Sequence, residues 1–350
     1  MMNLLFVWPR TPKGRILAAG ECARLRGMLR RGGRGDALMA PGIAAAVCLA
    51  LAVPLSGQGT SSAAGEHLNP VIHRLAAGEL VFGVSTYDLS LEHARSLARS
   101  DIDYVYVDME HGPMDFTALQ TFLLGMIDKQ AIAETDSLRP RVAALARIAP
   151  YGRETSAWAV KQALDIGLMG LIFPSIDTAE QAERAVRSMR YPQRRGSRYP
   201  QPPGQRGSGA AIATWFWGVS GAEYVRRADL WPLNPEGDLV ALMMMESAEG
   251  VRNADAIAAV PGVTGFYVGP SDLSNSLGLP RDAPEVEEAI QTVADVCVAR
   301  DIACGITASA ADMPRRIAQG FRILGAGRAG GGLTAGNAAA VRAGRSAPRN

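Results

Sequence analysis

Short apolar runs alternate along the chain with segments of helical periodicity, from about residue 80 onward. Continuous apolar runs of this length are typical of strands buried on both faces of a parallel sheet. We predict strands near Val81–Ser85, Tyr104–Asp108, Val142–Ile148, Gly170–Pro174, Leu239–Met245, Gly265–Val268, Ala303–Ile306 and Phe321–Gly325. We predict helices between them near Leu91–Ser100, Thr117–Asp128, Thr155–Ile166, Thr178–Met189, Gly250–Ala258, Pro284–Arg300 and Ala311–Gln319.

Eight strands with intervening helices over about 260 residues match an α/β fold of the (β/α)₈ TIM-barrel type. A doubly wound open sheet has the same local pattern and is the alternative. Such a sheet normally has a glycine-rich phosphate-binding turn after its first strand. In this chain Ser85-Thr86-Tyr87-Asp88 follows the first strand, which favours the barrel.

Residues 1–65 have the layout of an export signal. Five arginines between Arg24 and Arg34 precede the apolar run Ile43–Leu55, and small polar residues follow. We therefore expect a leader that is removed or disordered, and a periplasmic or extracellular protein. The alternative is a cytoplasmic protein whose translation starts at Met28 or Met39. The apolar run is shorter than the ~20 residues that span a bilayer, so we expect no stable membrane span.

The rest of the chain is assigned to an enzyme domain over residues 66–328 and a flexible or short helical tail over residues 329–350, with a helix near Asn337–Arg342. Tyr191–Gly237 is the longest irregular stretch, which is typical of a lid, an active-site loop or a subunit contact.

With 48% apolar and 20% charged residues the chain is globular in composition. Residues 1–62 carry a formal charge of +6, whereas the whole chain carries +2, so the remaining residues carry +2 − 6 = −4 and are mildly acidic. Nucleic acid is therefore not an expected partner.

Two of the four cysteines, Cys297 and Cys304, lie in the predicted enzyme domain. Their spacing matches no zinc motif. A disulfide between them is conceivable in an exported protein, but two buried free thiols are the favoured state.

The chemistry-bearing residues follow strand ends. Glu246 ends the run Met243-Met244-Met245, and Asp272 follows Val268-Gly269-Pro270-Ser271 after the next strand. The carboxyl ends of neighbouring barrel strands meet at one rim, so the two carboxylates are predicted to share a divalent cation. Carboxylate and water ligands suit Mg²⁺ or Mn²⁺, and they accept Co²⁺ as well. Such a cation, acting as a Lewis acid, would stabilise the enolate of a chelating 2-oxo acid.

Arg147 ends the third strand, where its guanidinium can bind a substrate carboxylate or a developing enolate oxygen. His111 follows Asp108 and Glu110 at the end of the second strand and is a candidate general acid–base. Asp165, near the end of a predicted helix, is a candidate to orient that imidazole. Each of these residues also has an ordinary structural interpretation as an ion-pair partner or a solvated acid.

These motifs together resemble the HpcH/HpaI-type class II 2-oxo-acid (pyruvate) aldolases, within the phosphoenolpyruvate/pyruvate barrel superfamily. The resemblance covers roughly residues 80–325. Its motifs are Phe82-Gly83-Val84, Val107-Asp108-Met109-Glu110-His111, Val160–Gly167, Ile172-Phe173-Pro174, Arg190-Tyr191-Pro192, Glu246–Gly250 and Val268–Ser274. The D-x-E-H and G-P-x-D-L-S pieces are fairly specific when they occur in this order.

The resemblance implies reversible cleavage of a 4-hydroxy-2-oxo acid into pyruvate, or a similar 2-oxo acid, and an aldehyde. It implies that Glu246 and Asp272 bind the metal and that Arg147 binds the pyruvate oxygens. It also implies that His111 transfers protons with support from Asp165 and Asp108, and that backbone N–H groups around Ser271 and Asp272 hold the pyruvate carboxylate.

The resemblance further implies a homo-oligomer, a trimer or hexamer, whose last helix is exchanged between neighbours. Two segments depart from the family pattern. Tyr191–Gly237 is longer and richer in proline and arginine, and we expect it to reshape the aldehyde pocket. The glycine-heavy Gly325–Gly332 stands where the exchanged helix should begin, which argues against that exchange.

Two other functions stay open at the level of sequence. An acyl-CoA lyase of the citrate or malyl-CoA lyase type would use the arginine-rich segment 194–206 to contact CoA phosphates. The second open function is that of an exported protein that binds a small carboxylate without catalysis. The combination of His111, Arg147, Glu246 and Asp272 argues against the second, because a binding protein needs no acid–base group beside a metal.

Overall fold

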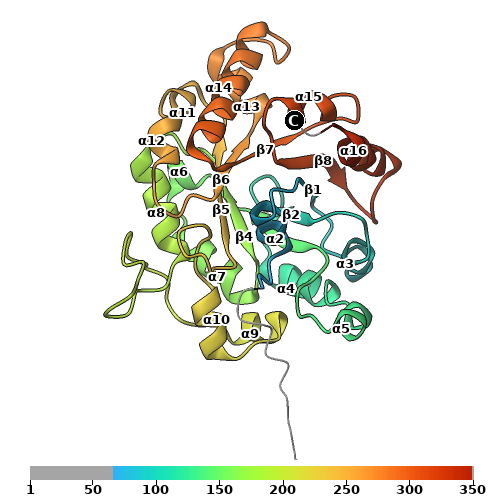
Figure 1. The fold of residues 1–350 in the computed structure, drawn as a ribbon, viewed down its shortest axis with the longest axis vertical. Helices are drawn as coiled ribbons and strands as arrows, with labels where there is room; N and C mark the ends of the chain where they lie inside the picture. Colours follow the sequence, from blue (N-terminus) through green and yellow to red (C-terminus); the bar gives the residue numbers. More distant parts are fainter. Residues whose placement is uncertain (1–65, 349–350) are drawn as a thin grey trace, which may run out of the picture. The chain divides into compact units, whose positions relative to one another are not determined.

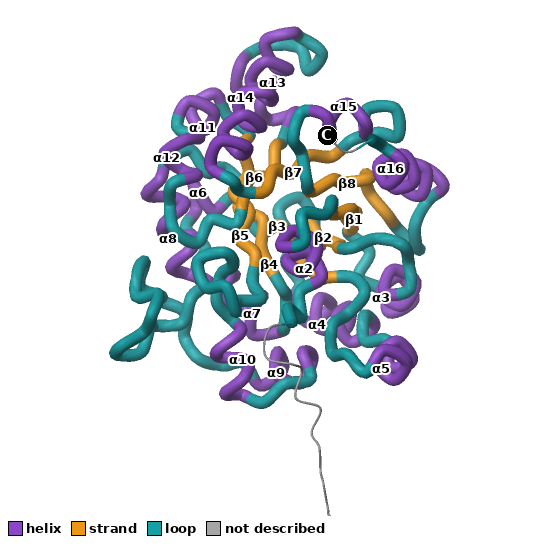
Figure 2. Tube along the Cα trace, viewed as in Figure 1, coloured by secondary structure: helices purple, strands orange, loops and turns teal. Residues whose placement is uncertain are grey.

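A closed barrel of eight parallel strands lies at the centre of the computed structural model, which describes residues 66–348 (Figures 1 and 2). The strands are adjacent in chain order, and pairing of the first with the eighth closes the barrel. Their bounds are β1 Val81–Thr86, β2 Tyr104–Asp108, β3 Ala143–Arg147, β4 Gly170–Phe173, β5 Val240–Met245, β6 Gly265–Val268, β7 Ala303–Thr307 and β8 Ile323–Ala329. The predicted TIM barrel is therefore confirmed.

Helices surround the strands (Figure 2). Those of the first half are α2 Pro70–Ala76, α3 Leu91–Ala98, α4 Phe116–Gly125, α5 Lys129–Thr135, α6 Tyr151–Glu154, α7 Ala157–Ile166 and α8 Ala179–Met189. Those of the second half are α9 Ala211–Trp217, α10 Gly221–Arg227, α11 Ala248–Arg252, α12 Ala254–Ala258, α13 Pro270–Leu277, α14 Pro284–Arg300, α15 Met313–Ala318 and α16 Ala335–Ser346. Among these described helices, none combines the length and apolarity needed to cross a bilayer.

Tyrosine rings fill part of the barrel interior. Tyr106 of β2 and Tyr267 of β6 meet edge to face with ring centroids 5.9 Å apart, and the Tyr267 hydroxyl is 2.9 Å from Thr307 Oγ1. A Cβ on Gly325 of β8 would lie 2.4 Å from the Tyr267 hydroxyl oxygen. Since real Cβ atoms do not approach so closely, β8 needs glycine here, and a glycine within a strand marks such a close approach.

The irregular stretch after α8 does not reach the carboxyl ends of the strands. It connects α8 to β5, and this kind of connection lies at the amino end of the barrel. Buried Arg190 holds it in place by donating to Asp229 and to the carbonyls of Tyr199 and Pro202. Within a single chain, therefore, Tyr191–Gly237 does not line the cavity in which we expected it to reshape the aldehyde pocket, because the segment lies at the other end of the barrel.

The C-terminal segment is more ordered than the sequence indicates. β8 continues through the glycines to Ala329, and α16 packs on the chain's own β1 and β8, with Gly344 against the Phe82 ring. Gly332, at φ +115°, donates its N–H to Nδ1 of buried His93 at 2.7 Å. The helix is longer than the one predicted within the tail, and it packs on the chain's own barrel.

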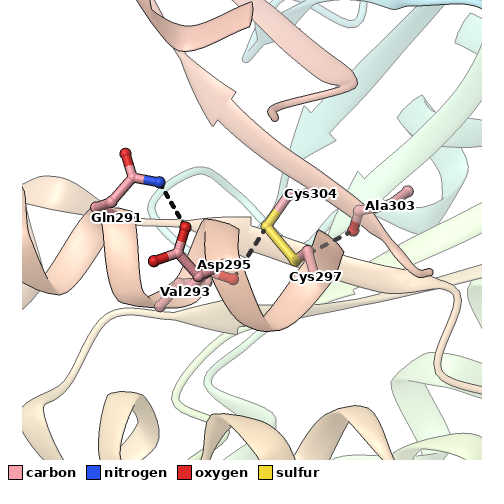
Figure 3. The surroundings of a disulfide bond; sticks show 6 residues. All are labelled: Gln291, Val293, Asp295, Cys297, Ala303 and Cys304. Atoms are coloured by element: carbon pink, nitrogen blue, oxygen red, sulfur yellow. Dashed lines mark hydrogen bonds between the residues drawn. A yellow bond between two sulfur atoms is a disulfide. The ribbon is translucent and has the colours of Figure 1, made fainter. Parts of the chain in front are cut away.

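Cys297 and Cys304 form a disulfide that joins α14 to β7 (Figure 3). Their Cα atoms lie 5.8 Å apart, within the usual range for a disulfide. The expectation of two free thiols is wrong, because the turn after α14 brings β7 back beside the last turns of that helix. The leader itself lies outside the described residues, and export stays a prediction.

Glu287 of α14 joins this helix to α15. Its carboxylate accepts hydrogen bonds from Arg315, Arg316 and Gln319 at 2.5 to 2.7 Å. Burial acts to raise the pKa of Glu287, but these donors outweigh burial and hold the pKa at about 2. Since glutamate titrates near 4.5 when unperturbed, folding favours the ionised form, and the resulting stability is present above pH 4.5 and lost as the pH falls through 2.

We expect Glu287→Gln to lower the free energy of unfolding at pH 7 by about 1 kcal/mol, a value reduced from the full pKa shift because the side chain is 37% exposed. Urea unfolding at pH 7 and at pH 3 measures this, with a smaller difference expected at pH 3. The neighbouring exposed Glu288→Gln is the matched control. Equal losses for the two variants at pH 7 would contradict the prediction.

Candidate active site

One polar cavity of about 620 Å³ opens at the carboxyl ends of the strands. Its wall comes from the segments that follow β2, β3, β4, β5 and β6, so five consecutive strands contribute to it. The lining residues are Glu110, His111, Pro150, Arg153, Glu154, Ser175, Glu246, Ser247, Asp272, Asn275 and Ser276. In TIM barrels this end carries the active site, and the cavity is the candidate here.

Glu246 and Asp272, the predicted metal ligands, line this same cavity. Glu246 directly follows β5 and is 7% exposed, and its Oε1 accepts the Ser175 backbone N–H at 2.7 Å. Its Oε2 would be 2.9 Å from a Cβ on Gly269, so the glycine lets the chain between β6 and α13 pass close to this carboxylate. Asp272, in the first turn of α13, is thereby brought near Glu246.

Ser271 and Asp272 occupy the N-terminal turn of α13, after Pro270 at its first position. The first N–H groups of a helix have no acceptor within the helix and favour an anion. The predicted contact of these N–H groups with a substrate carboxylate therefore has a suitable geometry.

Arg147, at the end of β3, lies under the cavity in a network of carboxylates. Its Nε and Nη2 donate to Asp108 at 3.0 and 2.5 Å, and its Nη1 is 3.1 Å from Glu110 Oε2 and 3.8 Å from Met244 Sδ. Burial acts to raise the pKa of Asp108, but the Arg147 hydrogen bonds outweigh it and hold this pKa below its usual range. Asp108 thus stays ionised and keeps the guanidinium oriented.

Glu110 was noted in the D-x-E-H motif but was not predicted as a site residue. Burial is the main cause that raises its pKa to about 7; Asp108 and Asp272 add to the rise, while Arg147 and Arg153 oppose it. Its Oε2 is buried and makes no well-aligned hydrogen bond, although Arg147 is at ion-pair distance. Its position between two predicted site residues was the signal that could have identified it.

His111 lies at the mouth of the cavity, with its side chain 56% exposed. Its Nε2 is 3.7 Å from Glu110 Oε2, and its backbone N–H donates to Asp108 at 3.4 Å. Asp108 therefore holds the backbone of this residue rather than its imidazole.

Asp165 lies away from the other predicted site residues. It is next to last in α7, and barrel helices run back against the strands, so this end of α7 lies toward the amino ends of the strands. Its Oδ1 accepts from Arg206 at 2.8 Å, and it does not line the cavity. The prediction that Asp165 orients His111 is therefore wrong within a single chain, because the helix direction carries it away.

The donor set fits a hard divalent cation. Burial raises the pKa of Glu246 to about 7, and the neighbouring Glu110 and Asp272 carboxylates add to it against the Ser175 hydrogen bond. Such crowding of acids favours a cation. Within residues 66–348 no group of three or more His, Cys, Asp or Glu side chains forms a complete metal site. Two carboxylates supplemented by water and substrate are the usual arrangement for Mg²⁺.

A parallel barrel with clustered carboxylates and a buried arginine at the carboxyl ends of its strands defines the class: a TIM-barrel enzyme with an acidic polar site. The sequence model of the HpcH/HpaI aldolase/citrate lyase family matches residues 90–334. The chain belongs to this family, which is one of carbon–carbon lyases.

Relatives with known activities agree with this assignment. The 2-keto-3-deoxy-L-rhamnonate aldolase of Escherichia coli (strain K12) is 34% identical over 251 residues, which is 71% of this chain and 82% of the relative. The hydroxypyruvate/pyruvate aldolase of Delftia acidovorans is 32% identical over 262 residues, 74% of this chain and 86% of the relative. The crystal structure of a family protein from Burkholderia cenocepacia aligns with a TM-score of 0.61 at 29% identity, covering 74% of this chain and 93% of that one.

Proposed function

We propose that this protein is a divalent-metal-dependent aldolase that cleaves a 4-hydroxy-2-oxo acid into pyruvate, or a similar 2-oxo acid, and an aldehyde. The main support is the meeting of Glu246 and Asp272, from consecutive βα segments, in one cavity at the carboxyl ends of the strands. The aldolase activities of the relatives from E. coli and D. acidovorans support the same reaction type.

Glu246 and Asp272 would hold the cation, because both present carboxylates to the cavity and the buried Glu246 gains most from a neighbouring positive charge. When bound, the cation supplies Lewis-acid stabilisation of negative charge on the 2-oxo group. Mg²⁺, Mn²⁺ and Co²⁺ all suit oxygen ligands, so the donor set does not favour one of them.

The chain's own groups account for substrate orientation. The first-turn N–H groups of α13 around Ser271 would receive the 2-oxo acid's carboxylate. Arg147 Nη1, which faces Glu110 and Met244 rather than Asp108, would donate toward the oxygen on which charge develops. Asp108 fixes the guanidinium through its Nε and Nη2, so little reorganisation is required.

In the cleavage direction, His111 would accept the proton of the 4-hydroxyl as the C3–C4 bond breaks. The bond's electron pair passes to C3–C2 and the oxo oxygen, which releases the aldehyde and leaves the enolate of the 2-oxo acid. Protonation at C3 then gives pyruvate. The imidazole is at the cavity mouth, where its proton can exchange with solvent.

We predict that the purified protein with Mg²⁺, Mn²⁺ or Co²⁺ exchanges the methyl protons of pyruvate with deuterium in D₂O, because enolisation needs no aldehyde. Proton NMR follows the loss of the methyl signal, with metal-chelated protein as the control. Protein that circular dichroism shows to be folded, yet exchanges nothing with any of the three metals, would exclude the proposal.

The alternative of an acyl-CoA lyase receives no support from the position of the arginine-rich segment 194–206. This segment belongs to the connection between α8 and β5, and none of its residues lines the cavity at the carboxyl ends. The aldolase is therefore favoured over a CoA-dependent lyase. The homo-oligomer stays a prediction.

A further inference from the structure

A small apolar cavity lies at the amino end of the barrel, opposite the active site. Its volume is about 40 Å³, and its walls come from α4, α5, α9 and the segments that precede β3 and β4. Met126, Met169 and Trp217 are almost fully buried in these walls, with exposures of 3%, 1% and 2%. The other large apolar side chains of the lining are Ile127, Ile132, Leu138 and Phe216.

The wall formed by α9 is fixed by close contacts with the barrel. Trp217 donates its indole N–H to the Gly167 carbonyl at 2.8 Å. A Cβ on Gly167 would lie 2.9 Å from the Phe216 ring, and a Cβ on Gly218 would lie 3.0 Å from Leu138. Since α9 is held at each of these points, the cavity is preformed, as ligand sites usually are.

The lining makes the cavity a poor place for water. A volume of 40 Å³ has room for about three water molecules, and a buried water needs two to four polar partners. The interior offers mainly methionine, leucine, isoleucine and aromatic side chains. An apolar group of a few carbon atoms would therefore displace poorly bound water, which favours binding.

Two arginines lie where this cavity adjoins a larger polar hollow of about 540 Å³. Arg139 and Arg141, on either side of Pro140, line both spaces. Arg139 already has partners, because its Nη1 is 2.6 Å from Glu66 and 3.1 Å from Nδ1 of His73. Arg141 is exposed, and within residues 66–348 it has no ion pair or side-chain hydrogen bond.

The carboxylates near Arg141 are engaged elsewhere. Asp128 accepts the N–H groups at the start of α5 and pairs with Arg99 at 3.2 Å. The acids that line the larger hollow, Glu79, Asp101 and Asp103, are paired with Arg74 and Arg345. The guanidinium of Arg141 is thus an uncompensated positive charge beside an apolar cavity.

We propose that the amino end of the barrel binds a monocarboxylate with a short apolar tail. The tail fills the cavity between α4, α5 and α9, and Arg141 binds the carboxylate at its edge through paired, charge-assisted hydrogen bonds. This site shares no described lining residue with the active-site cavity. The inference goes beyond the proposed aldolase function and does not depend on it.

The test is a titration of the full chain, labelled with ¹³C at the methionine methyl groups, with butanoate. The methyl resonances of Met126 and Met169, which line the cavity, are expected to shift. Met244, whose Sδ is 3.8 Å from Arg147 Nη1, reports on the active site and should not shift. Met126→Leu and Met169→Leu, which nearly conserve volume, assign the two resonances.

The tail and the charge are tested separately with matched probes. Acetate, which lacks two methylene groups, and butan-1-ol, which lacks the charge, should each bind at least about 10-fold more weakly than butanoate. Arg141→Gln should weaken butanoate binding by about 10-fold or more, and Arg141→Lys should retain part of it. Ala131→Leu, which places a larger side chain in the cavity wall, should abolish the Met126 and Met169 shifts.

Arg95→Gln is the matched control, because Arg95 is an exposed arginine that lines neither space, and this variant should bind butanoate as the wild type does. Methyl resonances of the unliganded variants that match the wild type away from the cavity show that they are folded. Butanoate that leaves Met126 and Met169 unshifted, or that shifts Met244 alone and so binds in the active site, would overturn the inference. Equal affinity of Arg141→Gln and the wild type, or of butan-1-ol and butanoate, would overturn it as well.

Discussion

Glu246→Gln is expected to lower the rate of metal-dependent pyruvate deuterium exchange on the order of 10³-fold, equivalent to about 4 kcal/mol of lost stabilisation. The amide keeps the shape of the side chain and one acceptor for the Ser175 N–H, but it removes the charge that would hold the cation. The same loss should appear in kcat/KM for aldol addition, and calorimetric titration should show weaker binding of Mn²⁺.

Glu249→Gln is the matched control for this variant. Glu249 is an exposed acid three residues further on, in α11, and it does not line the cavity. It should leave both exchange and Mn²⁺ binding near the wild-type values. If the folded Glu246→Gln protein kept the wild-type affinity for Mn²⁺ and the wild-type rate of exchange, Glu246 would not be a metal ligand.

Arg147→Lys is expected to reduce exchange and aldol addition by about 100-fold, although the positive charge is kept. A lysine cannot donate to both oxygens of Asp108 and still direct a third N–H group toward the cavity. Removing one oxyanion donor typically costs 10² to 10³ in kcat, and the lysine ammonium replaces only part of the arginine's geometry.

Loss of stability must be separated from loss of catalysis in this variant, because Asp108 is almost fully buried. Arg190→Lys provides the comparison, since Arg190 forms a similar two-point contact with Asp229 at the amino end of the barrel. Both variants should be less stable to urea, but only Arg147→Lys should lose exchange. Equal losses of deuterium exchange in the two variants would show that Arg147 has a structural role only.

The strands of the fold could be predicted because parallel barrel strands are buried on both faces and read as apolar runs. β8 was the exception. It continues through Gly325 and Gly327, where the side-chain pattern gives no strand signal, because pairing with β1 extends to Ala329. A helix within the tail was predicted near Asn337–Arg342, but the full length of α16 was not. The residues that anchor this end of the chain, His93 and Phe82, lie more than two hundred residues earlier in the sequence.

The candidate site was predictable where residues follow strands directly. Glu246 and Asp272 meet at the cavity because neighbouring strands end at one rim, and Arg147 lies beneath it for the same reason. Asp165 lies outside the cavity of a single chain because it stands near the end of α7, and a helix end carries no strand-end information. Arg153 could not be found from sequence, because its position depends on the fit of Gly152 against Ser175.

The most direct test of the account is a crystal of the protein grown with Mn²⁺ and oxalate, an analogue of the pyruvate enolate, and examined by anomalous diffraction. The account predicts one strong anomalous peak in the cavity, within coordination distance of carboxylate oxygens of both Glu246 and Asp272 and of the oxalate. A manganese peak coordinated by other residues, or a cavity that binds oxalate with neither carboxylate near the ion, would contradict it.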